Sequence, residues 1–220
     1  MKHDASKKSV LKRLFAAAMV LALALTATVA AQEKTKTPTP PAKLSEIRKH
    51  LGELQTRIAK TTESLDHLKK GAKDGSDLLA SYTKFDNQLK QLESLIEKVR
   101  AESTQMRARA GDYYSTWQSE LGKLTNPELR EKAQNRFQDA KDDFDEIIVA
   151  ADEAKRSLGP FMADLRDVHT YLATDLSVDS VKSISSTIWR LNSLSMSVIG
   201  AVQHLNGEIS RTLEQLPEGN

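Results

Sequence analysis

Acidic side chains recur on one face of a helix-like segment in the middle of the chain, at a spacing that could gather a hard cation. Carboxylates along a straight helix diverge, however, whereas calcium takes about six to eight oxygens that converge from a loop. If the helices before and after Asn126 pair antiparallel, Arg107 and Arg109 lie opposite Phe144 and Asp142. We therefore interpret the acidic stripe as a set of cross-helix ion-pair partners, and we predict no metal site. The stripe consists of Asp139, Asp142, Asp143 and Glu146.

The other reactive residue types lack the partners that catalysis requires. None of the histidines at 50, 67, 169 and 204 follows a glutamate by three residues, as the di-iron bundles require. The chain has no cysteine, no metalloprotease or serine-hydrolase motif and no phosphate-binding glycine loop. The many serines between 177 and 197 have no paired base and are interpreted as small and polar helix-face residues. The sequence thus predicts a protein that is not an enzyme, with no catalytic residue and no cofactor.

The charge balance changes when the N-terminal segment is set aside. The 220 residues suffice for one ordinary domain, and their net charge of +2 hints at a nucleic-acid partner. Residues 1–31 hold five basic residues and one acid, so the remaining chain carries a net charge of −2. The basic character therefore belongs to the N-terminus, and we predict no nucleic-acid partner.

The N-terminus has the organisation of a secretory signal peptide. A basic segment precedes an uncharged apolar run over residues 14–31, which ends in small residues. We predict cleavage near Ala31 and a periplasmic or secreted location. The alternative is an uncleaved anchor, because about eighteen apolar residues lie at the lower limit for crossing a bilayer. Residues 32–43, rich in proline, threonine and lysine, are predicted to form an extended linker.

From Leu44 to Leu216 the apolar residues recur at alternating intervals of three and four, which predicts amphipathic helices. The expected helices span residues 44–70, 76–124, 127–176 and 178–216, followed by a tail at 217–220. We expect Ser76, Asn126 and Ser177 to cap the second, third and fourth helices, with Pro127 at the first helical position. Pro160 lies inside the third helix without shifting the apolar register, which predicts a kink there.

Short connections between long helices require an up-and-down arrangement. The sequence therefore predicts an all-α fold, an elongated antiparallel bundle of three to four coiled-coil-like helices in a single domain over residues 44–216. Because the two central helices are longer than the others, the rod thins to a bare helical hairpin near Asn126.

Trp117 lies in the apolar seam of the second helix, which favours a core position. It also lies where the bundle thins, so an apolar interaction patch at the hairpin end is the alternative. Trp189 is one position off the fourth seam and is interpreted as a flank-packing residue. The candidate patch consists of Trp117, Leu121, Leu124, Leu129 and Arg130.

Two motifs near the hairpin end resemble a secreted bacterial family, domain of unknown function 2959. They are a Trp-x-x-Glu-Leu that begins at Trp117 and an Asn-x-x-Leu-Arg that begins at Asn126. A later proline, Pro160, and the leucine pair Leu172 and Leu176 match as well. The resemblance implies an extracytoplasmic helical rod and transfers no catalytic residue.

The preferred functional hypothesis is a noncatalytic coiled-coil protein of the cell envelope, with a structural or protein-interaction role. It implies an unidentified protein partner or self-association. The alternative is a helical rod associated with the membrane or cell-wall surface. Membrane contact is expected only through an uncleaved signal anchor or weak surface association, since no continuous basic face is present.

Overall fold

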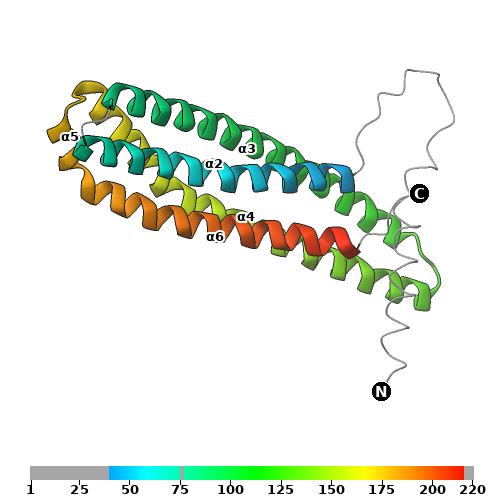
Figure 1. The fold of residues 1–220 in the computed structure, drawn as a ribbon. Helices are drawn as coiled ribbons and strands as arrows, with labels where there is room; N and C mark the ends of the chain where they lie inside the picture. The colour runs from blue at the N-terminus through cyan, green and yellow to red at the C-terminus, as the bar shows by residue number, and fades with distance from the viewer. Residues whose placement is uncertain (1–39, 75–76, 216–220) are drawn as a thin grey trace, which may run out of the picture.

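The computed structural model describes residues 40–74 and 77–215, which are almost entirely helical (Figure 1). No strand occurs within these residues, and the predicted all-α fold is confirmed. The predicted signal peptide, most of the predicted linker, Ser76 and the tail lie outside the described residues. The helices are α2 (Pro40–Asp74), α3 (Leu78–Gly122), α4 (Pro127–Thr174), α5 (Val178–Ser183) and α6 (Ser185–Gln215).

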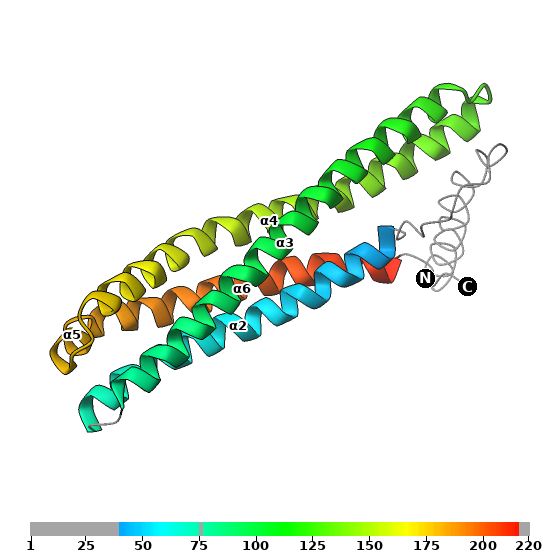
Figure 2. The same ribbon diagram turned by 90° about the horizontal axis from the view of Figure 1, so that it is seen from above.

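Four long helices form an up-and-down bundle in which each helix runs antiparallel to its neighbours. α2 packs on α3 and α6, while α4 packs on α6 and α3. α3 and α4 extend beyond the start of α2 and the end of α6, so one end of the rod has two helices instead of four (Figure 2). The predicted thinning of the rod toward Asn126 is therefore present in the structure.

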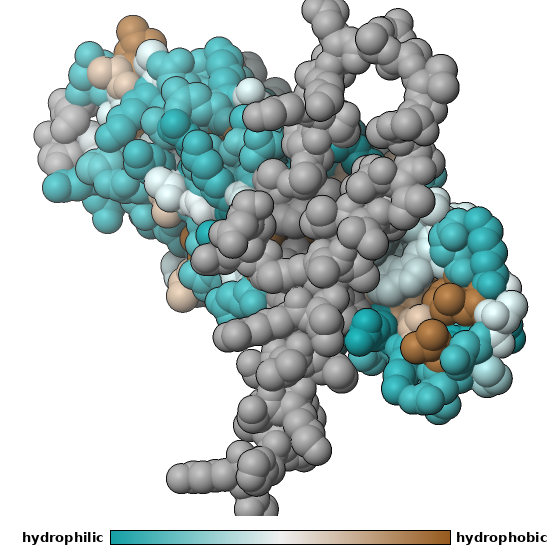
Figure 3. Space-filling model, turned by 90° about the vertical axis from the view of Figure 1, so that its right-hand side faces the viewer, coloured by the Kyte–Doolittle hydropathy of each residue, from teal (hydrophilic) through white to brown (hydrophobic). Residues whose placement is uncertain are grey.

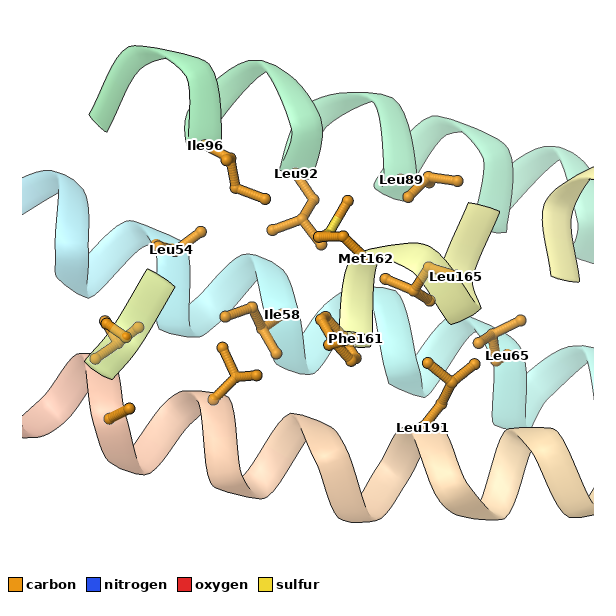
Figure 4. Close-up of a cluster of buried hydrophobic side chains, with 14 of the residues drawn as sticks. Leu54, Ile58, Leu65, Leu89, Leu92, Ile96, Phe161, Met162, Leu165 and Leu191 are labelled. Carbon is orange, nitrogen blue, oxygen red and sulfur yellow. The ribbon is translucent and has the colours of Figure 1, made fainter. Parts of the chain in front are cut away.

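The core fills the four-helix part of the rod. Side chains from α2, α3, α4 and α6 point toward one another there, among them Ile58, Leu92, Phe161 and Leu191, all fully buried (Figure 4). This continuous layer follows from the three-four spacing of apolar residues, which places one stripe of each helix on the bundle axis. α4 passes through Pro160 without a break, so the predicted continuity of register is confirmed, while the kink stays a prediction.

The N-terminal caps explain where the helices begin. Asn126 accepts hydrogen bonds from the amides of Glu128 and Leu129, with Pro127 in the first turn, as predicted. Ser177 likewise accepts from the amide of Ser180. α3 differs from the prediction, because its cap is Asp77, whose carboxylate accepts from the amide of Ala80 at 3.1 Å.

The helix ends differ from the prediction: α2 ends at Asp74 instead of residue 70, α3 at Gly122 instead of 124, and α4 at Thr174 instead of 176. Two larger differences have local causes. α2 begins at Pro40, inside the predicted linker, because proline is compatible with the first helical turn, where its missing N–H has no partner to lose. The predicted fourth helix is divided at Ile184 into α5 and α6. Just before that break, the Ser183 hydroxyl donates to the carbonyl of Ser180 at 2.7 Å, a local bond of the kind that competes with helical hydrogen bonding.

Candidate functional site: the α3–α4 arm

The part of α3 and α4 beyond the four-helix bundle, together with its turn, is the arm, which we define as residues 110–141. Near its base, the His50 imidazole of α2 bonds Glu102 of α3 at 2.8 Å. On the other side, Arg211 of α6 pairs with Glu146 of α4 at 3.3 Å. α2 continues past His50 as far as Pro40, and Leu44 and Ile47 are still buried there. The arm extends beyond the start of α2 and the end of α6, and there α3 and α4 run as a pair (Figure 2).

A cluster of aromatic rings holds the arm together at its base. The Trp117 ring meets the Phe137 ring edge to face, with centroids 5.5 Å apart, and also contacts Tyr113 at 5.6 Å. Tyr114 lies against Phe137 at 5.9 Å, and its hydroxyl donates to the carbonyl of Ala140 at 2.7 Å. Burial raises the pKa of Tyr114 far above its usual value, with smaller contributions from Tyr113 and nearby aspartates. Two helices alone thus form a small aromatic core.

The members of the predicted patch have different positions in the arm. Trp117 and Leu124 are half-buried, Leu121 is buried with 6% exposure, and Leu129 is 54% exposed. Leu121 therefore supports the turn from inside and does not present an apolar surface, which corrects its assignment to an exposed patch. Viewed end-on, hydrophobic surface appears between the two helices at the arm's end (Figure 3).

Arg130 fixes the connection at the arm's tip. Its guanidinium donates through Nε to the carbonyl of Leu124 at 2.8 Å and through a second nitrogen to the same oxygen. Leu124 lies in the turn, one residue past Lys123, the C-cap of α3, so this bond ties the first turns of α4 to the connection. Arg130 is thus a capping residue of the turn, and Leu129 is the large apolar side chain beside it that faces solvent.

The acidic stripe does not pair as predicted. Arg107 was expected near Phe144, but its guanidinium bonds Asp152 at 2.8 Å. Glu146 pairs with Arg211 of α6, and Asp142 accepts a hydrogen bond from Gln138 of its own helix. Side chains lean toward the N-terminus of their helix, so a side chain of α3 leans away from the turn and one of α4 leans toward it. Arg107 therefore meets a carboxylate farther along α4 than the backbone levels suggest. Within the described residues, no three histidine, aspartate or glutamate side chains gather in a way suited to a metal ion.

Each of the four histidines in the described residues lies within reach of a carboxylate. His169 of α4 bonds Asp86 of α3 at 2.9 Å and stacks on the Tyr82 ring, and His204 of α6 reaches Glu153 of α4 at 3.2 Å. With His50 on Glu102, three of the four connect neighbouring helices. His67, His169 and His204 lie on helix faces as predicted, whereas His50 is buried at 8% exposure.

Trp189 contradicts its predicted role as a flank-packing residue. Its side chain is 71% exposed on α6, and Met196 of the same helix is 75% exposed. Sequence reasoning assigned a single apolar seam to this helix and missed these two residues. Their separation of seven positions, on a face distinct from the buried seam, is the signal that indicates a second contact surface.

The fold defines the class of protein: it is an elongated all-α protein with a buried leucine-rich core and a protruding two-helix arm. Residues 42–215 match the family model described as a protein of unknown function, DUF2959. Because this match covers most of the chain, the protein belongs to that family. Comparison with curated proteins gave no match, and comparison with solved structures gave none either.

Proposed function

We propose that this protein is a noncatalytic helical-bundle module of the bacterial cell envelope that binds a protein partner through the tip of its arm. The observation that carries the proposal is the arm itself, in which α3 and α4 leave the bundle and expose Leu129 beside the half-buried Leu124. Anchors of binding surfaces are commonly large side chains beside a well-packed support. At the tip, buried Leu121 and the bond from Arg130 to the carbonyl of Leu124 provide that support.

The surface of the rod favours an interaction role over a chemical one. Many of its charged groups bond one another, either within one helix, as Lys90 does with Asp86, or between helices, as in the two-point contact of Arg190 with Asp164 and the pair of Arg166 with Glu93. Such pairs hold the helices of a scaffold in register. The exposed apolar side chain at the tip is what distinguishes the surface of the arm from these paired charges. The location in the envelope rests on the N-terminal sequence, which has the organisation of a signal peptide.

The decisive experiment is in-cell crosslinking and affinity capture with a tag placed after Asn220. Leu129→Asp puts a charge on the exposed tip without removing a buried contact, so we expect it to abolish capture of the partner. Leu79→Asp is the matched control, because Leu79 is 65% exposed near the opposite end of α3. Equal capture by both variants would contradict a role for the tip.

Location and surface association have separate tests. We expect a fusion of residues 1–43 to a reporter that works only outside the cytoplasm to be active. Within the described residues, no helix has both the length and the apolar character that crossing a membrane requires. Sedimentation of the purified protein with anionic liposomes would support the alternative of a membrane-surface rod, which we do not favour.

A further inference from the structure

The outward face of α6 carries a second seven-residue pattern, distinct from the buried seam. Its exposed residues recur at alternating intervals of three and four, which is the spacing of a coiled-coil contact. Small residues occupy one position of the repeat, while Trp189, Met196 and Gln203 occupy the other. We call this surface the outer stripe, and it consists of Ser186, Trp189, Ser193, Met196, Gly200, Gln203 and Gly207.

We propose that two copies of this chain associate through the outer stripe, with their α6 helices packed antiparallel around a two-fold axis. This interface lies on α6 and not on the arm, so it stands independently of the proposed function. Trp189 is 71% exposed and Met196 is 75% exposed, seven positions apart on this face. Large apolar side chains gathered on a solvent-facing surface indicate a contact with a partner.

The sizes of the side chains select the antiparallel orientation. In a parallel pair, Trp189 would meet the partner's Trp189 and Gly200 would meet the partner's Gly200, which crowds one layer and leaves a void in the next. In the antiparallel pair, Trp189 faces the partner's Gly200, and Met196 faces the partner's Ser193. Every large residue then fills the space above a small one, as close packing requires. Antiparallel helices also align their dipoles favourably.

Charges on α4 complement one another in the same arrangement. The axis keeps α4 on the same side in both copies, so the two α4 helices flank the contact. Within one copy, Arg190 of α6 contacts Asp164 and His204 contacts Glu153, which places Arg156 of α4 near the level of Gly200. Asp167 lies near the level of Trp189 by the same reasoning. Trp189 faces the partner's Gly200 in this arrangement. Asp167 and Arg156 lie at these two levels and are both exposed, so Asp167 faces the partner's Arg156. The two-fold axis generates this pair twice.

The area of the surface suits a stable dimer. The outer stripe from Ser186 to Gly207 is about 32 Å long at 1.5 Å per residue. α2 and α4 both pack on α6 and stand back on either side of it, so the facing surface with their flanking rows is about 25 Å wide at most. This gives an upper limit of about 800 Å² per copy, which reaches the usual size of a specific interface.

The absence of cysteine from the chain allows a direct test of the geometry. A single cysteine in Ser193→Cys lies near the axis, so we expect a short thiol crosslinker to join two copies. Ser186→Cys lies about 25 Å from its counterpart in the antiparallel pair and should not crosslink. Mixing Ser186→Cys with Gln203→Cys should restore the product. Equal crosslinking of Ser186→Cys and Ser193→Cys would indicate a parallel pair and overturn the proposal.

Filling the space at Gly200 tests the packing by sedimentation velocity. A side chain added at Gly200 meets no atom within 4 Å in the single chain, so Gly200→Leu should keep the fold. It should weaken dimerisation by at least about tenfold, because two symmetry-related spaces are overfilled. Gly111→Leu on α3 is the matched control, since Gly111 is equally open. A wild-type protein that sediments as a monomer at every soluble concentration, or a Gly200→Leu variant that dimerises normally, would refute the interface.

A charge swap tests the flanking pair. Arg156→Glu and Asp167→Arg should each weaken the dimer severalfold, because each places like charges opposite one another at two sites. The double variant should recover most of the loss. Failure of the double variant to recover would show that these residues do not face each other across the axis.

Discussion

The Trp117 indole of α3 and the Phe137 ring of α4 meet edge to face, with an interplanar angle of 87° and centroids 5.5 Å apart. Both residues lie in the arm, where α3 and α4 extend beyond the start of α2 and the end of α6 (Figure 2). The arm therefore depends on a small aromatic cluster for cohesion, whereas the bundle depends on the four-helix core.

Trp117→Ala should loosen the arm and leave the bundle folded. Replacing a large, half-buried aromatic side chain removes both its buried area and its ring contacts, for a local loss of about 2–3 kcal/mol. Hydrogen exchange should become faster in residues 110–141 and remain unchanged around Phe161. Uniform loss of protection in both regions would show that the arm and bundle unfold as one unit.

Tyr114→Phe should have a smaller effect in the same region. The change removes the hydroxyl that donates to the carbonyl of Ala140 at 2.7 Å and retains the ring contacts with Phe137 and Phe144. We expect a loss of about 1 kcal/mol, the net value of a typical hydrogen bond, in the exchange protection of the arm. An effect as large as that of Trp117→Ala would contradict this division of roles.

Asp86 should make stability depend on pH in the acidic range. The ammonium of Lys90, which donates to the carboxylate, holds the pKa of Asp86 below its usual value, and His169 contributes in the same direction. A lowered pKa means that the unfolded chain binds this proton more readily than the folded chain. The contribution is therefore complete above pH about 4 and is lost as the pH falls through the pKa of the folded state.

The comparison of the wild type with Asp86→Asn isolates this contribution. Urea unfolding should show a difference between the two proteins at neutral pH that shrinks toward zero in acid. Asp112→Asn is a control at an exposed aspartate of α3. A difference that stayed constant across the acidic range would exclude titration of Asp86 as its source.

Pro160→Ala tests the predicted kink in α4. Proline cannot donate an amide hydrogen bond, so alanine should stabilise the helix interior by up to about 3 kcal/mol and straighten α4. Gly159→Ala is the matched control, because it improves helix propensity by about 1 kcal/mol without restoring a donor. Distances between spin labels on the two halves of α4 should lengthen in Pro160→Ala alone. Unchanged distances would show that no kink depends on Pro160.

The helical bundle follows from the local spacing of apolar residues, which can be read directly from the sequence. The spacing of Leu44, Ile47 and Leu51 repeats through the chain, and amphipathic helices with short connections have few ways to bury their apolar faces. The cap at Asn126 was predictable for the same reason, since its hydrogen bonds involve residues only two and three positions away.

Which side chains are exposed on the two candidate surfaces depends on contacts between residues that are distant in the sequence. The arm was expected from helix lengths, but the division between buried Leu121 and exposed Leu129 depends on how the turn folds around Arg130. The outward position of Trp189 depends on which face of α6 is covered by α2 and α4.

The sequence by itself determined the class of fold, the order of the helices and the position of the thin end, because helix formation and amphipathic burial are governed by neighbouring residues. Only the tertiary structure decided that Arg107 bonds Asp152, that Leu121 lies inside the arm and that Trp189 and Met196 face solvent. The physical reason is that exposure and pairing depend on the rotation and relative shift of whole helices. A seven-residue pattern defines a face, but the partner that covers it is selected by packing across the bundle.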